Sequence, residues 1–392
     1  MKFDPIKFIT TLLTLMFITS SCSDKDEPSV PEKDAARTIL IYMAANNSLA
    51  DYACDTKDIE EIRSAARSGA LGKDGRLILF HAPRDGSRTL YEVTNSGELK
   101  VLKTYPGGTN ATDFVVSADF MVSVFNDAKA IAPAKDYGLI MWSHAFGWTQ
   151  NGLPDDGPTI TPKTWGDDKG RSMNITTLAK VLKVSPWSWV YFDCCFMGSV
   201  EVAYQLAPVL PRMVASATEV PLDGMPYDKN LPLLFLPQAD LTGAARNTFE
   251  YYDALHGEDR TVSVSVFELE GMAELAEATR AVYETSSVFE VYDFYNLPLE
   301  ESFNPRFYDL GVYVEGMCKA NGLQSLYPMW QQAYKKVVVY EAATPMLWDA
   351  IDLSDFTGMS TYIPRNISDM SYRGYNTLLW YEDVAKYLYD KQ

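Results

Sequence analysis

The stretch Trp187–Cys195 reads WSWVYFDCC, and the stretch Ser199–Leu206, SVEVAYQL, follows it after three residues. An apolar run such as WSWVYF is typical of a strand that is buried on both faces, as in a parallel sheet. A buried strand that leads through polar residues into a helix is the repeating unit of an open α/β sheet. Ligands of such sheets bind at the carboxyl ends of the strands, so chemistry is expected at Asp193, Cys194 and Cys195.

Further apolar runs and helical stretches alternate along the chain. The apolar runs are Thr38–Ala45, Arg76–Phe80, Tyr137–Trp142 and Met213–Ala217. The other helical stretches are Asp51–Ser68, Thr112–Ala130 and Met173–Leu182. This alternation predicts an α/β fold with a mainly parallel sheet and crossover helices. From about Phe249 the strands become less regular, which predicts a second domain or a C-terminal half packed on the first.

The composition is that of a globular protein. Of the 392 residues, 47% are apolar and 22% are charged, which excludes a disordered chain and a coiled coil. The net charge of −18 argues against nucleic acid as a partner, because phosphate contacts need clustered Lys and Arg. The same charge suits a basic partner. Five cysteines are too few for a disulfide scaffold.

The N-terminal residues have the order of a secretory signal. Two lysines lie within Met1–Lys7, an apolar run covers Phe8–Thr19, and small residues lead to Cys22. The end of this segment resembles a bacterial lipobox, which implies residues 1–21 as a lipoprotein signal peptide and Cys22 as the lipidated residue. The following Ser23–Glu27 is similar to the acidic export tag of surface lipoproteins, and residues 22–36 form an acidic, proline-containing tether. The alternative is an ordinary signal peptide cut nearby.

Two strand ends supply a candidate nucleophile and a candidate base. Of the three histidines, His144 follows the run YGLIMWS, and Cys195 ends a strand 51 positions later. A single crossover would place the two side by side, and an imidazole beside a thiol can serve as its acid and base. His81 also follows a strand but is followed by a plain turn, and His256 lies in a polar stretch. A lone histidine at a strand end is otherwise a structural residue.

The strand alternation separates the two adjacent cysteines. Asp193 and Cys195 fall on one side and Cys194 on the other, which makes Cys195 the reactive candidate and Cys194 a buried one. The position of Cys195 before a helix predicts that the helix N-terminus favours the thiolate. The alternative is that both are small core residues, as expected for Cys54 and Cys318.

The sequence resembles the clostripain family of cysteine peptidases, within the clan of the caspases, gingipains and legumains. The matching blocks are TILIYMAANNSLADY at Thr38–Tyr52, DYGLIMWSHAFGW at Asp136–Trp148, VYFDCCFMGSVEVAY at Val190–Tyr204, SATEVPLDGMPY at Ser216–Tyr227 and FTGMSTYIP at Phe356–Pro364. The resemblance implies a caspase-like α/β/α sandwich with a mainly parallel central sheet, in a peptidase domain at residues 37–248. A family-specific C-terminal domain at residues 249–392 would pack on it.

The resemblance also implies the residues of the reaction. His144 and Cys195 would be the catalytic dyad, and cleavage would follow Arg or Lys of protein or peptide substrates. The acids of the specificity pocket would be Asp193 and Asp223, whose alternatives are a structural carboxylate and a turn residue. Backbone N–H groups of Ala145 and Cys195 would hold the oxyanion. Ala145 stands where the family usually has glycine, and its Cβ limits the backbone angles there.

Some relatives are activated by cleavage between the histidine and the cysteine. Lys163, Lys169 and Arg171 lie in this interval, and the polar segment around Lys169 and Arg171 is expected to be exposed and cleavable. The reaction requires no cofactor, although some relatives use calcium. The paired acids Asp155-Asp156 and Asp167-Asp168 are typical of solvated turns, and no metal site is predicted.

Taken together, these features predict a cysteine endopeptidase anchored to a membrane by lipid. Its expected location is the outer membrane or cell surface of a Gram-negative bacterium, or else the periplasm or the medium. One alternative is an inactive surface lipoprotein that binds peptide or glycan, for which the 13% aromatic residues would supply the platform. Another is a transpeptidase that passes the acyl group to an amine.

Overall fold

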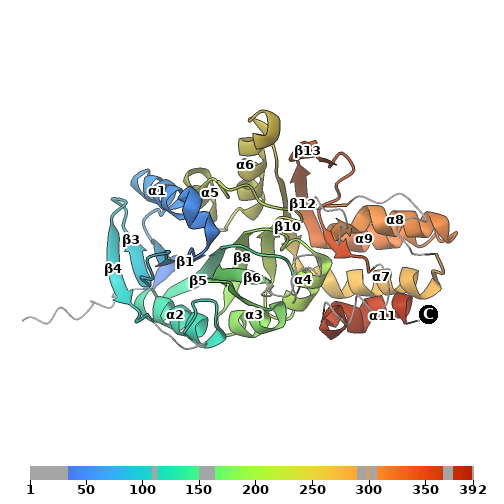
Figure 1. Ribbon diagram of the computed structural model, residues 1–392, viewed down its shortest axis with the longest axis horizontal. Coiled ribbons are helices and arrows are strands. Elements are labelled where there is room, and N and C mark those ends of the chain that lie inside the picture. Colours follow the sequence, from blue (N-terminus) through green and yellow to red (C-terminus); the bar gives the residue numbers. More distant parts are fainter. Residues whose placement is uncertain are drawn as a thin grey trace, which may run out of the picture. The chain divides into compact units, whose positions relative to one another are not determined.

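A nine-stranded sheet forms the centre of the structure (Figure 1). The computed structural model describes residues 34–107, 113–149, 164–288, 298–299, 307–364 and 374–390. Within them the strand order is β12-β10-β9-β8-β5-β1-β2-β3-β4. The bounds are β1 Ala35–Ala44, β2 Gly75–Ala82, β3 Thr89–Val93, β4 Leu99–Thr104, β5 Ala134–Trp142, β8 Trp187–Asp193, β9 Arg212–Ala215, β10 Ser263–Glu268 and β12 Val338–Ala343.

The five predicted apolar runs are the five strands that pair in parallel at the middle of the sheet. β1 pairs with β2 and β5, β5 pairs with β8, and β8 pairs with β9. From Ile39 to Ala45 every side chain of β1 and the residue after it is buried, as two covered faces require. The α/β fold with a mainly parallel centre is therefore confirmed.

Antiparallel strands complete both edges of the sheet. β3 and β4 extend it beyond β2, and β10 and β12 extend it beyond β9. The predicted boundary between residues 248 and 249 lies within α6 (Leu241–Asp253), and both β10 and β12 come after it. The C-terminal residues therefore contribute strands to the central sheet in addition to the helices packed beside it.

Helices cover both faces of the sheet, which gives three layers (Figure 1). One face carries α1 (Cys54–Arg67), α5 (Tyr227–Leu234) and α6, and the other carries α2 (Ala118–Ile131), α3 (Ile175–Leu182) and α4 (Val200–Leu206). The alternation along β1 serves both layers. Ile39 and Ile41 belong to the core under α1, whereas Leu40 and Tyr42 belong to the core under α2.

Two predicted helices begin later than the sequence pattern indicates. The predicted helix Asp51–Ser68 is divided into η1 (Ser48–Tyr52) and α1, because Ala53 between them is left-handed with φ 55°. The predicted helix Thr112–Ala130 begins at Ala118, and Thr112 lies outside the described residues. The long helix therefore begins only after this residue, at Cys54.

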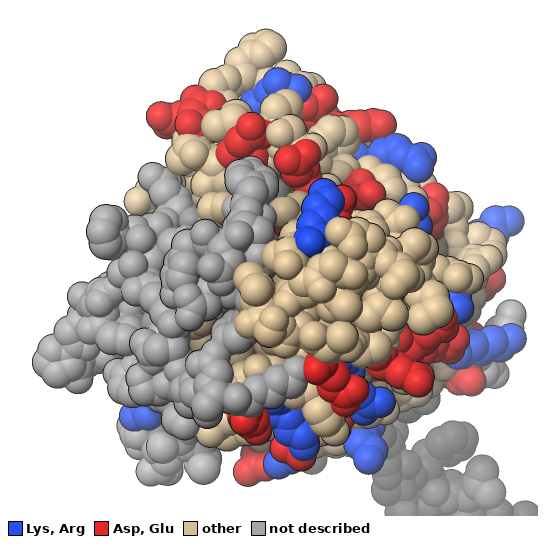
Figure 2. Space-filling view, turned by 90° about the vertical axis from the view of Figure 1, so that its right-hand side faces the viewer, with Lys and Arg blue, Asp and Glu red and all other residues tan. Residues whose placement is uncertain are grey.

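The C-terminal residues form a group of helices beside the β10–β12 end of the sheet (Figure 1). They are α7 (Met272–Thr285), α8 (Leu310–Ala320), α9 (Tyr327–Val337) and α11 (Lys386–Tyr389). On the face shown in Figure 2, Lys and Arg are interspersed with Asp and Glu and do not gather into a basic patch. None of the helices in the described part of the chain has the length and apolar character needed to span a membrane.

Glu201 is a buried carboxyl group that joins α4 to β15 (Ser360–Tyr362). Its Oε1 accepts hydrogen bonds from the Tyr362 backbone N–H at 2.9 Å and from the Thr361 hydroxyl at 3.1 Å. Burial raises the pKa of Glu201 to about 7. The folded protein therefore holds this proton more tightly than the unfolded chain does. The resulting stability is greatest below the unfolded pKa and is lost as the pH rises through about 7.

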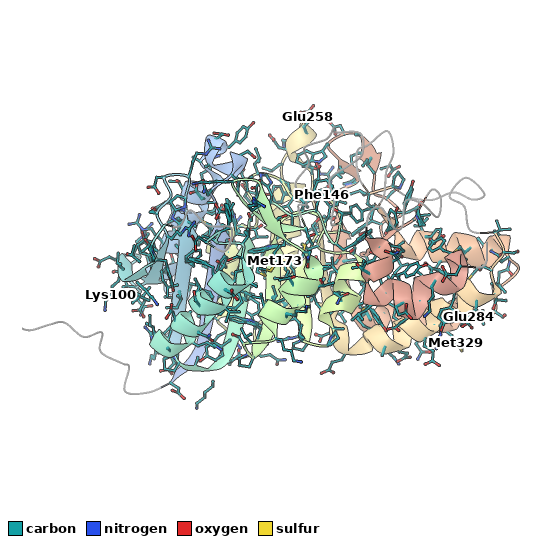
Figure 3. The ribbon with its side chains drawn as sticks, turned by 60° about the horizontal axis from the view of Figure 1, so that its bottom comes forward. Lys100, Phe146, Met173, Glu258, Glu284 and Met329 are labelled. Carbon is teal, nitrogen blue, oxygen red and sulfur yellow. The ribbon has the colours of Figure 1, made fainter. Side chains whose placement is uncertain are left out.

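We expect Glu201→Gln to raise the melting temperature by several degrees at about pH 8 and to leave it unchanged at about pH 4. Glutamine keeps the acceptor oxygen but cannot ionise. Thermal unfolding of the variant and the wild type at both pH values checks this, with Glu258→Gln as a control. Glu258 is exposed at the surface, at the top of the view in Figure 3. A difference of equal size at both pH values would contradict the expectation.

Candidate active site

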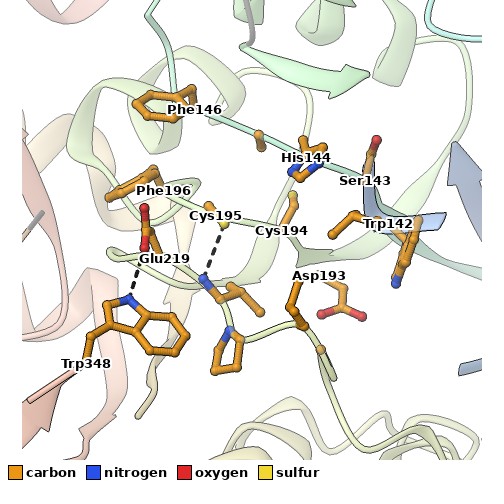
Figure 4. Close-up of a pocket in the computed structure, with 16 residues that line it drawn as sticks. Trp142, Ser143, His144, Phe146, Asp193, Cys194, Cys195, Phe196, Glu219 and Trp348 are labelled. Atoms are coloured by element: carbon orange, nitrogen blue, oxygen red, sulfur yellow. Dashed lines mark hydrogen bonds between the residues drawn. The ribbon is translucent and has the colours of Figure 1, made fainter. Parts of the chain in front are cut away.

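His144 and Cys195 line one cavity of about 310 Å³ at the carboxyl edge of the sheet (Figure 4). They come together because β5 and β8 are parallel neighbours in which Trp142 lies opposite Asp193. Each of the two candidate residues follows its strand by two positions. The structure thus brings together the pair that the strand-end argument singled out.

The loop after β1 holds the imidazole of His144. The Ser48 hydroxyl lies 2.9 Å from His144 Nε2. Ser48 is itself placed by Asn47, whose Nδ2 donates to the carbonyls of Ala44 at 2.8 Å and Asp167 at 3.0 Å. The Ser48 hydroxyl thus contacts one of the two ring nitrogens through which a histidine can act.

The residue before His144 is part of the same buried network. The Ser143 hydroxyl donates to the Ala44 carbonyl at 2.8 Å and accepts from the Asp167 N–H at 3.0 Å. These bonds join β1, β5 and the hairpin of β6 (Trp165–Asp168) and β7 (Arg171–Met173). The backbone that carries His144 is therefore fixed on two sides.

A strained residue presents Cys195 to the cavity. Phe196 directly after it has φ 59°, a left-handed value that residues other than glycine rarely adopt. Its N–H donates to the Thr218 carbonyl at 2.9 Å, and its ring stacks on Phe307 with centroids 5.1 Å apart. Cys195 Sγ accepts a hydrogen bond from the Val220 N–H at 3.3 Å.

The thiol of Cys195 holds its proton tightly. Burial raises the pKa of Cys195 to about 12, and the negative charges of Glu219 and Asp193 act in the same direction. Helix α4 begins only at Val200, and the Ser199 side chain already accepts the Val202 N–H at its N-terminus. The prediction that this helix favours the thiolate is therefore wrong. Cys54, Cys194 and Cys318 are buried, as expected.

Asp193 lines the cavity from a buried position. Its carboxylate accepts hydrogen bonds from the Met225 N–H and the Tyr227 hydroxyl, both at 3.0 Å. Gly224 passes close to it with φ 59°, and a Cβ there would come within 2.9 Å of Asp193 Oδ2. Burial raises the pKa of Asp193. The carboxyl is thus held in place while being denied water.

A second buried acid, Asp58 on α1, lies behind the wall of the cavity. Its Oδ2 accepts a hydrogen bond of 2.6 Å from Nε1 of Trp142, which lines the cavity. Burial and the charge of Asp193 both raise the pKa of Asp58. Asp58 was not predicted from the sequence, because it is one of several acids in a helical stretch and nothing in that stretch marks the acid that faces the sheet.

Asp223 lies outside the group of residues that line the cavity. Its side chain is 52% exposed, and Oδ1 is 3.6 Å from Lys57 Nζ. Of the two acids expected in the pocket, the structure places Asp193 in the cavity wall and Asp223 near the surface beside a lysine.

The backbone at Ala145 accommodates the side chain that replaces the usual glycine. Ala145 is buried and is not among the residues with positive φ. The His144 carbonyl accepts from Gly166, and the Phe146 N–H donates to Thr164, so both face β6. Because successive groups of an extended chain point to opposite sides, the Ala145 N–H points away from β6.

Glu219 and Trp348 also line the cavity, and neither was predicted from the sequence. Trp348 Nε1 donates to Glu219 Oε2 at 3.0 Å. Trp348 lies in the turn between β13 (Met346–Leu347) and β14 (Ile351–Asp352), far along the chain from the dyad. The turn at Trp348 is marked by a strained backbone with a positive φ, which cannot be read from a sequence.

The segment around Lys169 and Arg171 is a hairpin and not an open loop. Both side chains are exposed, as expected, but Lys169 has φ 54° and its N–H donates to the Asn46 carbonyl at 3.1 Å. The acids before it are buried, and Asp168 accepts from the Asn46 side chain at 2.8 Å. The prediction of a solvated turn at Asp167-Asp168 is therefore wrong.

Several predicted residues lie outside the described ones: Cys22, Asp155, Asp156 and Lys163. Within the described ranges, no group of three or more His, Cys, Asp or Glu side chains is placed to hold a metal ion.

The chain matches the sequence model of the clostripain family over residues 41–388. The chain belongs to the clostripain family. It is therefore a cysteine peptidase by family, with the fold that the resemblance implied. No curated protein sequence matches the chain.

Solved structures of this family are similar to the chain over nearly its whole length. A C11 protease of Parabacteroides distasonis, described as an inactive zymogen, has 24% identity and a TM-score of 0.76, covering 91% of this chain and 99% of that one. A secreted C11 cysteine protease of Bacteroides thetaiotaomicron, bound to an irreversible peptide inhibitor, has 25% identity and a TM-score of 0.75, covering 89% and 98%.

We expect iodoacetamide to alkylate Cys195 at a rate that rises about tenfold per pH unit from about pH 7 to pH 10, without a plateau. The reason is that the thiolate fraction grows in this way below a raised pKa. Mass spectrometry of labelled peptides measures the rate, and Cys195→Ala supplies the background from the buried cysteines. A plateau below about pH 8 would show a thiolate already formed and would contradict the expectation.

Proposed function

We propose that this clostripain-family protein is an endopeptidase that cleaves after Arg or Lys through a dyad of Cys195 and His144. The observation that carries the proposal is one cavity lined by a thiol, an imidazole and a buried carboxyl group, Asp193. The thiol and imidazole supply the chemistry of acyl transfer, and the carboxyl supplies a partner for a cation.

The raised pKa of Cys195 determines how the first step runs. At neutral pH the thiol is protonated, so His144 takes the proton as Sγ attacks the carbonyl carbon. The oxyanion that forms accepts hydrogen bonds from the backbone N–H groups of Ala145 and Cys195. The imidazolium then gives its proton to the leaving amine, and a C–N bond breaks. Water, deprotonated by His144, hydrolyses the thioester and restores the thiol.

Ser48 has a positioning role in this scheme. Its hydroxyl at Nε2 restrains rotation of the imidazole and accepts a hydrogen bond from the Nε2–H in the tautomer whose Nδ1 acts as the base. This supports catalysis by the dyad alone, without an acid as a third member. A neutral hydroxyl takes the place of the carboxylate that orients the histidine in other hydrolases.

The charges around the cavity support a basic residue before the cleaved bond. None of the described residues that line the cavity is Lys or Arg. Asp193 and Asp58 are both buried, and their mutual repulsion disfavours two negative charges in one place. A guanidinium or ammonium group entering beside Asp193 relieves that repulsion, and the Trp142 ring covers its aliphatic stem.

The N-terminal segment supports a membrane anchor. We propose lipidation at Cys22, with residues 22–36 as the tether and the outer membrane or cell surface as the location. The support is the order of basic, apolar and small residues before Cys22. The Bacteroides relative described as secreted is compatible with export. The proposed steps need no cofactor. Any effect of calcium is tested by running the assay with and without it.

We expect the wild type to hydrolyse fluorogenic peptides that end in Arg or Lys and Cys195→Ala to hydrolyse none of them. For Asp193→Asn we expect a loss of about 100-fold in kcat/KM. The substitution removes the charge that faces the substrate cation. Since burial raises the pKa of Asp193, this carboxyl gains its charge as the pH rises through neutral, and the preference for Lys over Leu should rise with it.

The control for this experiment is Asp223→Asn, which should have a smaller effect because that carboxylate is exposed beside Lys57. The assay includes reductant and is run with and without calcium. Cleavage after Leu alone would keep the dyad and reject the pocket. No turnover, even after deliberate cleavage near Lys169, would favour a binding lipoprotein, and ligated products would indicate a transpeptidase.

We further propose self-cleavage after Lys169 or Arg171. A protease binds extended chain, so the tight turn at Lys169 must open first, and we expect processing to be slow in the folded protein. Mass spectrometry should find two fragments in aged wild type and an intact chain in both Cys195→Ala and the double variant Lys169→Ala/Arg171→Ala. A fully active protein whose chain stays intact would rule the processing out.

A further inference from the structure

We propose that Glu219 and Trp348 bind a second cationic side chain of the substrate, next to the cleaved bond, so that the preferred substrates carry two adjacent basic residues. The inference rests on the proposed function and names the substrate class of the same cavity. It assigns a role to two residues that the reaction itself does not need.

The cavity has carboxyl groups in two of its walls. In the view of Figure 4, Cys195 lies between Asp193 on one side and Glu219 on the other. Asp193 ends β8, whereas Glu219 belongs to the segment after β9. A substrate whose basic side chain occupies the region of Asp193 therefore still meets a second carboxylate beside the nucleophile. A neighbouring Lys or Arg side chain is of the right charge for it.

Trp348 gives this carboxylate a defined geometry. The indole Nε1 donates to Glu219 Oε2 at 3.0 Å, so the ring is held against the carboxylate. A carboxylate has about four acceptor sites, and the indole N–H uses one of them. The half-buried ring adds an aromatic face to the same cavity. A carboxylate and an indole side by side bind a cation through both charge and the ring quadrupole.

The backbone under Trp348 is strained in a way that brings its ring to the cavity. Trp348 and Asp349 both have φ 53°, and the Ala350 N–H donates to the Leu347 carbonyl at 2.9 Å across the turn. Turns of this type normally carry Gly or Asn at these positions. The Trp348 N–H is held by the Thr261 hydroxyl at 3.1 Å. A tryptophan kept in an unfavourable turn at a reaction site is an outlier from which a role can be inferred.

A cation at Glu219 would also affect the nucleophile. The charge of Glu219 contributes to the raised pKa of Cys195. An ammonium or guanidinium group bound there offsets that charge and makes the thiol easier to deprotonate. The second basic residue therefore assists the chemical step as well as binding, and its effect should be visible in kcat/KM.

The test compares peptides with one and two basic residues. Internally quenched peptides contain Lys at the cleaved bond and Ala, Glu or Lys at the position before it, and a second set varies the position after it. In one of the two sets, we expect kcat/KM for the Lys-Lys peptide to be about tenfold higher than for the peptide with Ala at the varied position. The peptide with Glu at that position should have the lowest kcat/KM of the set.

The assignment to residues uses isosteric variants. In Glu219→Gln, which keeps an oxygen for the indole, the ratio between the Lys-Lys and Ala-containing peptides should fall to about one. Trp348→Phe should lower it in part, because it keeps an aromatic face but loses the hydrogen bond. The matched control, Glu258→Gln, removes an exposed carboxylate that is not among the residues lining the cavity and should keep the wild-type ratio.

The outcomes separate this inference from the proposed function. Cleavage of singly basic peptides without a gain from a second Lys, or a gain that survives in Glu219→Gln, would overturn the inference alone. No cleavage of either peptide by the wild type would overturn the proposed function and this inference with it. Calorimetry on Cys195→Ala supplies a readout without turnover, in which tighter binding of the Lys-Lys peptide should be lost on adding Glu219→Gln.

Discussion

The parallel pairing of β5 with β8 is the constraint on which the rest of the site depends. It places Trp142 opposite Asp193 and so brings His144 and Cys195 to one edge of the sheet. β1 lies on the other side of β5, and the loop after it carries Ser48 to the imidazole. A shift in the register of these strands would separate all three groups at once, because each follows directly from the end of its strand.

Much of this arrangement could be predicted from the sequence. Apolar runs buried on both faces are conspicuous, and few histidines compete with His144. The residues that escaped prediction depend on contacts far apart in the chain or on backbone conformation. Asp58 is distinguished from neighbouring acids only by facing the sheet, Ala53 breaks a helix that its composition favours, and Trp348 reaches the cavity through a strained turn.

The electrostatics of the cavity oppose the free nucleophile and favour the bound substrate. Burial of Cys195, together with the charges of Glu219 and Asp193, makes its thiolate unfavourable and raises its pKa to about 12. A cationic substrate offsets the part of that effect that comes from the carboxyl groups, because it neutralises their charges. The charges proposed to select the substrate therefore also restrain the thiol while no substrate is bound, and a thiol that stays protonated is less open to oxidation.

The C-terminal residues support the nucleophile as well as the sheet. Ser360 bonds to the Gly198 carbonyl at 3.0 Å, directly after the strained turn at Phe196, and Phe307 stacks on the Phe196 ring. Both contacts come from the small sheet of β11 (Phe307–Asp309) and β15. A left-handed phenylalanine persists only where its surroundings hold it. The position of Cys195 is thus determined from both halves of the chain, and the family match likewise extends beyond the dyad, to residue 388.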